Sequence, residues 1–554
     1  MNRIRKSIIF LITVILLIGV IQPLFTYISA SYYEEYPLNL SQQTNQSIVG
    51  FSKNKLLSTD DGIYPHHVEV SMAISDNGII FVGWKEALGH NTAGIDVSIV
   101  RSTDDGNTWS SPYSMNNYNG LNTGKSDPWL YWFNGTLYYA YLEYEFSGSL
   151  TQITVAKSND YGISWTEVNA TNADYFADKE TIVVGENNTI YVVYDDVDTS
   201  TIDGNATIRV SRSLNGGDTY QEISIIGEDE FFVGPYITLN SSGDPFVAWS
   251  WVPDEGGNLF LSKSHDGGII FDQPQIVNDD GNYSAFEPSG GYPGKATLPV
   301  IKFDQYDRLY ILWADKFDQV TNSYDVYLRY SDNFGSNWSD RIRVNPSIAG
   351  DQWNPDMVID TTGKLHIAYY SEIDGYYRSY YRTVNFTGIG RNETTLSDEI
   401  QIASRRTSNS FTRPGEYLAI QLDRNDIPHV AWSDGRNDEM DIYYAYGLTE
   451  LPYPLVSTII IIIIISIIGT LTLVTLYYLK YKRSSSMKDE EKVIQKEKIS
   501  TDRTSEERRK LYMKTYPYFC DNCKKFNTIR DYCENCGSKD SIRYASKEDY
   551  KKYL

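Results

Sequence analysis

The stretch RSTDDGNTW, residues 101–109, decides the fold because near-copies of it recur downstream. The copies are STDDGNTW (102–109), SNDYGISW (158–165), SLNGGDTY (213–220), SHDGGIIF (264–271) and SDNFGSNW (331–338), which share Ser-x-Asp/Asn-x-Gly-x-x-aromatic. An Asp or Asn side chain can accept backbone N–H bonds across a turn, and Gly permits the positive φ that a tight turn requires. We therefore interpret each copy as a structural turn. Acidic turns can also coordinate Ca²⁺, so a Ca²⁺ loop is the alternative.

A longer repeat surrounds these turns. Short apolar stretches, each ending in an aromatic residue, recur at intervals of 53 to 64 residues, and the aromatic positions are Trp84, Tyr141, Tyr194, Trp249, Trp313, Tyr369 and Trp432. Four short antiparallel strands per unit are typical of a β-propeller blade. We predict an all-β propeller of about seven four-stranded blades over residues 63–450, or six if one unit forms a side hairpin. The lead-in segment 31–62 either closes the ring or forms a stalk.

The repeated turns resemble the Asp-boxes, or bacterial neuraminidase repeats, of the sialidase superfamily. The residues that carry this resemblance are Asp104, Gly106, Trp109, Asp160, Gly162, Trp165, Asp266, Gly268, Gly335 and Trp338. The resemblance implies that the boxes join the third and fourth strands of their blades, on the face away from the active site. Function is therefore expected on the opposite face.

That opposite face collects the loops that follow the second strands and the loops that enter the first strands, because neighbouring strands alternate in direction. The ligand-face candidates are His66, Asp127, Asp178, Lys179, Glu180, Arg413, Asp434 and Arg436. This rim is rich in carboxylates, which can bond sugar hydroxyls, while nearby Tyr and Trp rings can stack on sugars.

Catalysis is left open by the sequence. The sialidase resemblance implies three substrate-binding arginines, a Tyr nucleophile activated by a Glu, and an Asp acid, but the family's aromatic-Arg-Ile-Pro motif does not occur in this sequence. Residues that could take part are Asp127, Arg413, Glu416 and Tyr417, and none is assigned a catalytic role. We expect non-catalytic binding of an extracellular glycan or protein ligand. The alternatives are an exo-acting glycoside hydrolase of the sialidase type and a structural surface-layer component.

Apolar segments divide the chain. Residues 1–30 carry basic residues before an apolar run, as a signal peptide or N-terminal anchor does. Residues 455–479 are apolar and uncharged, long enough for a transmembrane helix, and Lys480, Lys482 and Arg483 follow. Flanking cations mark the cytoplasmic side, so we predict a single-pass plasma-membrane protein with the propeller outside. The chain carries a formal net charge of −23, and its acids lie mostly in the outer part, so no nucleic-acid partner is expected there.

The tail holds all the cysteines. A charged linker, 480–514, leads to a segment, 515–546, in which Cys520 and Cys523 form one C-x-x-C pair and Cys533 and Cys536 form another. Two such pairs at this spacing are typical of a small zinc ribbon with one tetrahedral, structural Zn²⁺. We expect this ribbon to dock a cytoplasmic partner.

Overall fold

The structure of the protein is a computed structural model. It describes residues 47–59, 64–88, 96–115, 123–145, 151–171, 175–198, 205–230, 232–251, 257–278, 298–316, 323–408, 417–437 and 439–449, several residues between 464 and 479, and 514–553 apart from 516, 529, 530 and 532. The predicted signal segment, most of the predicted span and nearly all of the charged linker lie outside these residues. The chain divides into two compact units, Met1–Leu451 and Pro452–Leu554.

The first unit consists almost entirely of antiparallel sheets, which confirms the all-β prediction. In chain order, the first sheet is β3 His66–Ile74, β4 Ile80–Ala87, β5 Asp96–Ser102 and β6 Tyr113–Ser114; the second is β7 Thr123–Phe133, β8 Thr136–Glu145, β9 Thr151–Ser158 and β10 Thr166–Asn169; and the third is β11 Phe176–Val184, β12 Ile190–Val197, β13 Asn205–Ser213 and β14 Gln221–Glu230. The fourth sheet is β15 Phe232–Leu239, β16 Pro245–Trp251, β17 Asn258–Lys263 and β18 Gln275–Ile276, and the fifth is β19 Val300–Phe303, β20 Leu309–Asp315, β21 Asp325–Ser331 and β22 Ile342–Arg343. The sixth sheet is β23 Gln352–Ile359, β24 Leu365–Ile373, β25 Tyr376–Thr387 and β26 Glu393–Leu396, with β27 Ile400–Gln401 and β28 Thr407–Ser408, and the last is β29 Ala419–Leu422, β30 Pro428–Asp434 and β31 Asp441–Leu448.

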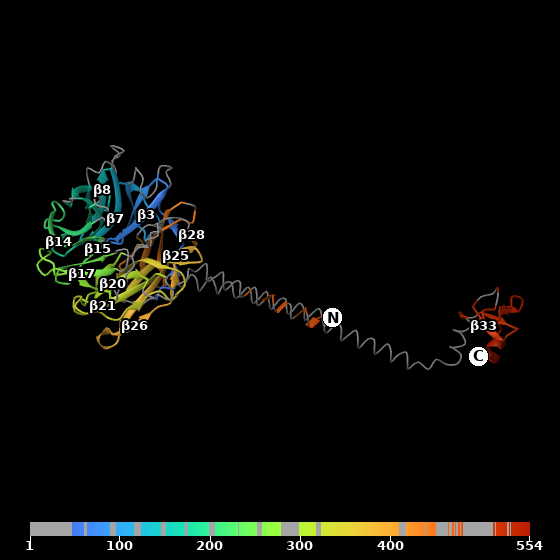
Figure 1. Ribbon diagram of the computed structural model, residues 1–554. Coiled ribbons are helices and arrows are strands. Elements are labelled where there is room, and N and C mark those ends of the chain that lie inside the picture. The colour runs from blue at the N-terminus through green and yellow to red at the C-terminus, as the bar shows by residue number, and fades with distance from the viewer. Residues whose placement is uncertain are drawn as a thin grey trace, which may run out of the picture. The chain divides into compact units, whose positions relative to one another are not determined.

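These sheets form a closed ring. The first strand of each sheet contacts the first strand of the next, in the order β3, β7, β11, β15, β19, β23, β29, and β29 contacts β3 again. Figure 1 shows the sheets following one another in chain order around a common centre. A ring of radially arranged sheets with their first strands innermost is a β-propeller.

The lead-in segment closes this ring. Strands β1, Gly50–Phe51, and β2, Lys55–Leu56, both pair with β31 of the last sheet, with Gly50 opposite Leu448 and Lys55 opposite Tyr444. The outermost position of the last sheet is thus filled by the beginning of the propeller sequence. The sequence left open whether the lead-in closes the ring or forms a stalk. The structure places these residues in the last sheet, where they close the ring.

The recurring aromatic residues of the second strands form the centre of the core. Trp84, Tyr141, Tyr194, Trp249, Trp313, Tyr369 and Trp432 all have an exposed fraction of 0 %. Each lies on a strand with sheet neighbours on both sides and packs between two sheets, so large flat side chains fill the wedge between neighbouring sheets. The regular spacing in the sequence therefore reflects one buried anchor per sheet.

The two ends of the propeller differ. The end at which the third strands finish and the boxes begin is called the box end, and the opposite end, at which the first strands start, is called the mouth end. Within the described part of the chain, no helix has both the length and the apolar character needed to cross a bilayer. In the second unit, β32 Tyr518–Cys520, β33 Lys525–Asn527 and β34 Ile542–Tyr544 form a small sheet, followed by α4 Lys547–Tyr553.

Candidate functional site

The first strands are bent in the same way where they enter the mouth end. Register shifts interrupt β3, β7, β11, β15 and β23. A residue with positive φ lies at each shift: Glu69 (57°), Asp127 (52°), Lys179 (52°), Gly234 (65°) and Asn354 (45°). A β-bulge re-aims its side chain, and non-glycine residues in this left-handed region are uncommon and cluster at functional sites. Four of these five bulges thus place a polar residue at the mouth end, and the fifth has a glycine.

The bulge side chains are joined by ion pairs and hydrogen bonds. Glu69 Oε1 lies 3.1 Å from Lys85 Nζ, and Glu69 Oε2 accepts a 3.2 Å hydrogen bond from the backbone N–H of Asp127. Asp127 Oδ1 in turn lies 2.5 Å from Lys179 Nζ and accepts a 3.3 Å bond from the Tyr417 hydroxyl. This chain links the first three sheets to the last one, and we call Asp127, Lys179 and Tyr417 the mouth triad.

Two further carboxyl groups are fully buried beside the mouth triad. Burial raises the pKa of Glu180 well above its usual value, and the nearby charge of Asp127 raises it further. Neither carboxyl oxygen of Glu180 has a hydrogen-bond partner among the described residues. Burial, together with the charge of Asp178, likewise raises the pKa of Asp195, whose Oδ2 accepts a 3.2 Å bond from the Gly234 N–H. Because ionising a buried carboxyl group is costly, burial favours the protonated form of both groups.

A cavity of about 280 Å³ lies among the first strands. Its lining includes Trp129, Tyr236, Lys302 and Asp356. The Lys302 ammonium lies 5.2 Å from the centre of the Tyr236 ring. Burial raises the pKa of Asp356 to about 6, although the charge of Lys302 opposes that rise. The cavity thus joins aromatic walls to one cation and one acid that titrates near neutrality.

A smaller pocket shares part of this lining and extends it to the mouth triad. This mouth pocket is lined by residues that include Trp129, Lys179, Tyr236, Asn354, Asp356 and Tyr417. The rings of Trp129 and Tyr417 meet edge to face with centroids 5.9 Å apart, and the Lys179 ammonium lies 5.9 Å from the centre of the Tyr417 ring. The pocket therefore places aromatic surface directly beside polar groups.

The predicted ligand-face residues fall into different places. Asp127 and Lys179 meet in the mouth triad, Asp178 and Glu180 flank them on β11, and His66 begins β3 at the same end of the propeller. Arg413 and Glu416 lie outside the described residues.

Asp434 and Arg436 instead bind each other and neighbouring side chains beside the last sheet. Asp434 accepts bonds from Thr407 Oγ1 at 2.6 Å and Trp432 Nε1 at 3.0 Å. The Arg436 guanidinium pairs with Asp434 and lies 4.0 Å from the centre of the Tyr443 ring. Both side chains are nearly fully buried by these contacts, so we assign them a packing role.

Several mouth residues were not predicted, namely Glu69, Trp129, Tyr236 and Asn354. A signal for three of the bulges exists in the sequence, because Pro directly follows the bulge residue in Asp127-Pro128, Gly234-Pro235 and Asn354-Pro355. Proline cannot donate to the strand ladder and is found in sheets mainly at edges and bulges. Pro near the start of a first strand could therefore have located the bulges.

At the box end, the five boxes share one hydrogen-bond pattern. In the first, Ser102 Oγ donates to Asp104 Oδ1 at 2.9 Å and accepts from the Gly106 N–H at 2.9 Å, while Asp104 accepts from the Thr108 N–H and hydroxyl at 2.7 Å each. The aromatic residue reaches the neighbouring sheet, since Trp109 meets Tyr444 edge to face at 4.8 Å. Both Asp104 oxygens are thus occupied within the turn, which argues against the Ca²⁺ alternative at this box.

The other copies repeat the serine bond. The N–H groups of Gly162, Gly217, Gly268 and Gly335 donate to Ser158, Ser213, Ser264 and Ser331 at 2.8–2.9 Å. Asp160 and Asp266, and Asn215 and Asn333, occupy the position of Asp104. Trp165 packs against Tyr139, and Trp338 against the core. All five boxes are therefore the same turn.

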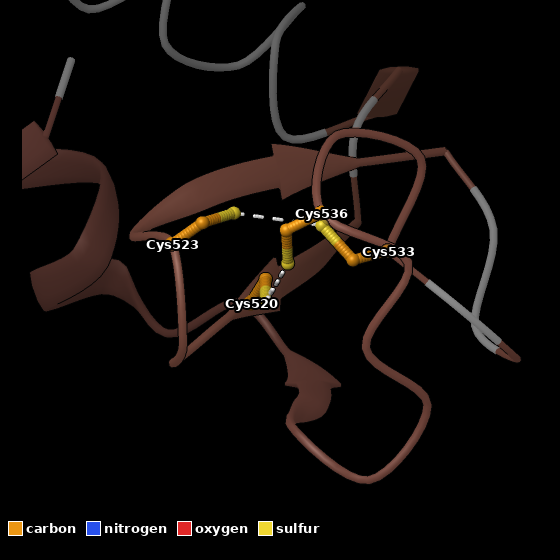
Figure 2. Close-up of side chains that lie close together, drawn as sticks. All are labelled: Cys520, Cys523, Cys533 and Cys536. Carbon is orange, nitrogen blue, oxygen red and sulfur yellow. Dashed lines mark hydrogen bonds between the residues drawn. The ribbon is translucent and has the colours of Figure 1, made fainter.

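In the second unit, the four cysteines converge (Figure 2). Their sulfur atoms all lie within 4.8 Å of one another, with Cys520 Sγ 3.8 Å from Cys536 Sγ and Cys523 Sγ 3.5 Å from Cys533 Sγ. Four thiolates around a tetrahedral Zn²⁺ with bonds of about 2.3 Å stand about 3.8 Å apart, so the donor set and spacing fit that ion. This is the one potential metal-binding group of three or more side chains among the described residues.

Comparison with known proteins gives only distant structural matches. No protein-family model and no curated protein matches the sequence. Similar solved structures include a protein of unknown function from Dyadobacter fermentans (16 % identity over 59 % of this chain and 96 % of that chain, TM-score 0.44), the GH93 α-L-arabinofuranosidase of Fusarium graminearum with arabinobiose (12 %, 72 % and 99 %, 0.43) and the phage phi92 endosialidase (12 %, 72 % and 70 %, 0.42). Likeness at this level carries no conclusion about activity, so we argue function from the residues of this chain.

Proposed function

We propose that the propeller is a surface-anchored module that binds a glycan at the mouth pocket without cleaving it. The observation that carries the proposal is the pocket lining, in which Trp129 and Tyr417 lie beside Lys179, Asn354 and Asp356. A sugar ring has an apolar face that packs on aromatic rings and a rim of hydroxyls that bond amide, ammonium and carboxylate groups. Aromatic and polar groups at one opening match both requirements.

The proposal of binding without catalysis rests on the pairing of the mouth charges. Lys179 and Tyr417 both bind Asp127 Oδ1, so the one carboxyl group of the mouth triad already has two partners. The sialidase resemblance implies three arginines around the substrate, whereas the linings of the two described pockets include none.

A glycosidase of the sialidase type is the second candidate, and one contact favours it. The Tyr417 hydroxyl lies 3.3 Å from the Asp127 carboxylate. A carboxylate at that distance can accept the proton of a phenol and so make it a better nucleophile. This arrangement would suit attack on a glycosidic carbon if the ligand entered the mouth pocket.

One set of variants separates the two candidates. The detergent-solubilised full chain would be applied to a glycan array and assayed with fluorogenic glycosides, together with Tyr417→Ala, Tyr417→Phe and a control, Tyr113→Ala, on an outer strand. We expect glycan binding that falls at least about tenfold in Tyr417→Ala and persists in Tyr417→Phe and the control, since the ring supplies the contact. Turnover that disappears in Tyr417→Phe would replace the binding proposal with the glycosidase. Absence of both binding and turnover would contradict both candidates.

We further propose that residues 455–479 anchor the chain in the plasma membrane with the propeller outside, and that the cysteine ribbon binds a structural Zn²⁺ and docks a cytoplasmic partner. The uncharged apolar run and the cations after it support the anchor. The converging sulfurs support the zinc site. Because four thiolates leave no open position, the metal would hold the ribbon together, leaving its surface for docking. Anchoring would be tested by sodium carbonate extraction, which should leave the chain in the membrane pellet.

A further inference from the structure

The sixth sheet has no box and carries a different feature at the box end. Its third strand, β25, continues into a hairpin with β26 whose tip is the short 3₁₀ turn η1, Ile389–Arg391. Ile389 at this tip is fully exposed. Gly388 (φ 80°) and Gly390 (φ 71°) flank it and allow the tight turn.

The tip is held in place by the neighbouring fifth sheet. Arg308 donates to the backbone carbonyls of Arg391 at 2.7 Å and Gly390 at 2.9 Å. Arg391 Nη1 lies 2.6 Å from Asp304 Oδ2, and its guanidinium lies 4.8 Å from the centre of the Tyr306 ring. These bonds fix the backbone directly after Ile389.

The resulting surface group, which we call the tip cluster, consists of Ile389, Tyr306 and Arg391. Tyr306 has an exposed fraction of 63 %. An isoleucine held out to solvent on a fixed turn contributes nothing to the core, although burying it against an apolar phase would be favourable. Tyr is enriched at membrane interfaces, and Arg can lay its stem on apolar surface while its charge stays in water.

Few residues separate the box end of the propeller from the proposed membrane span. Strands β25 and β31 are the third strands of neighbouring sheets, so the tip and Leu448, the last residue of β31, lie at the same end of the propeller. Only residues 449–454 lie between Leu448 and the apolar run that begins at Leu455. Six extended residues reach at most about 20 Å. If the run enters a bilayer, the box end must lie close to it.

We propose that the tip cluster rests on a zwitterionic lipid surface, with Ile389 inserted at the headgroup level, so that the mouth pocket opens away from the membrane. This inference rests on the proposed membrane anchor. Exposed box-end carboxylates such as Asp105 and Asp266 would repel anionic lipid. The surface therefore fits phosphatidylcholine-like headgroups.

The test places a photocrosslinking amino acid, p-benzoylphenylalanine, at position 389 of the full chain in phosphatidylcholine vesicles. The matched control is position 88, because Leu88 has an exposed fraction of 60 % and follows the second strand of the first sheet at the mouth end. We expect lipid adducts by mass spectrometry at 389 and not at 88. Equal yields at both positions, or no lipid adduct at 389, would overturn the inference, and a protein adduct at 389 would replace lipid with a protein partner.

Carbonate extraction of the same vesicles separates this inference from its premise. Release of the chain would overturn the anchor and the inference together, whereas a retained chain without adducts at 389 would overturn the inference alone. Ile389→Ser should fold with an unchanged melting temperature because its side chain is fully exposed. In vesicles with increasing anionic lipid, crosslinking at 389 should fall by several-fold, and an increase would contradict the proposed lipid preference.

Discussion

The glycine of the first box, Gly106, is required for two separate physical reasons. Gly106 has a φ of 79°, a conformation that costs an L-residue about 1–2 kcal/mol. In addition, a Cβ at this position would lie 2.2 Å from the Tyr444 hydroxyl oxygen of the neighbouring sheet. Gly78 has a similar φ of 85° but open space around it, so it separates the backbone effect from the packing effect.

We therefore expect Gly106→Ala to destabilise the propeller more than Gly78→Ala. Both variants carry the backbone cost, and Gly106→Ala adds about 1–3 kcal/mol of overpacking against a buried ring. Thermal unfolding of the full chain would measure the difference. Equal melting temperatures for the two variants would contradict the packing described at the boxes.

Asp356 gives the propeller a pH dependence of known sign. Burial raises the pKa of Asp356 to about 6 from its ordinary value of 3.8. The folded state thus holds this proton more tightly than the unfolded state, so the contribution is present below about pH 4 and is lost as pH rises through about 6. The free energy of unfolding should fall over this window by at most about 3 kcal/mol from this group.

The Asp356→Asn variant should lack that dependence. Chemical unfolding at several pH values between 4 and 7.5 would compare its slope with that of the unchanged chain. Asp160→Asn is the control, because hydrogen bonds from Ser164 and Ser158 hold the pKa of that carboxyl below its usual range and its titration lies outside the window. Identical slopes for Asp356→Asn and the unchanged chain would contradict the burial of Asp356.

At the scale of elements, the ring depends on its last sheet being completed by its N-terminal segment. Leu57 follows β2, is 5 % exposed and packs with Trp84 and Tyr444, and its N–H donates to the Ile442 carbonyl at 2.8 Å. Leu56, its neighbour, is 50 % exposed. The two adjacent leucines therefore form an internal comparison of a buried and an exposed position.

Leu57→Ala should cost about 2–5 kcal/mol, the usual range for a buried leucine, and Leu56→Ala less than about 1 kcal/mol. Denaturant unfolding followed by tryptophan fluorescence would measure both, since Trp84 lies in the same cluster. If Leu57→Ala cost no more than Leu56→Ala, the segment would not close the ring as described.

The ribbon is a second element whose stability is expected to depend on a ligand. Arg543 joins its strands to α4 by binding Asp521 at 2.7 Å and Asp549 at 2.6 Å, and Ser546 caps α4 through the Asp549 N–H at 3.2 Å. These contacts are few, and Arg543 and Asp521 are exposed, so we expect the cysteine cluster to supply most of the cohesion.

Metal analysis of the purified full chain should find about one zinc per chain. Cys533→Ser should remove it, because Cys533 lies in the sulfur cluster, while Lys539→Ala, exposed on the same ribbon, should retain it. Zinc retained in Cys533→Ser, or absent from the unchanged chain, would contradict the zinc proposal.

At the scale of the whole molecule, the two compact units should unfold independently. No metal cluster of the described residues lies in the first unit, while the cysteine cluster lies in the second. Calorimetry should therefore show that a zinc chelator lowers only the transition of the ribbon. A chelator that also lowered the main transition would show that the propeller depends on a metal.

The parts of this protein that the sequence predicted are those set by local chemistry. The boxes follow from Ser, Asp or Asn, and Gly within a few residues, and the buried aromatics recur because every sheet needs one anchor. Arg436 was predicted at the ligand face from its position after a second strand, and the structure shows its guanidinium held by Asp434 and Tyr443. A side chain of that length has several reachable partners, and sequence spacing does not choose among them.

The sequence by itself thus determined the repeated turns, the sheet order and the cysteine pairs, since each depends on contacts between near neighbours in the chain. Only the tertiary structure decided the mouth. Tyr417 meets Asp127 across 290 sequence positions, and Lys179 and Asn354 line the mouth pocket from the bulges of their strands. The physical reason is ring closure, which places the starts of the first strands side by side however far apart they lie in the sequence.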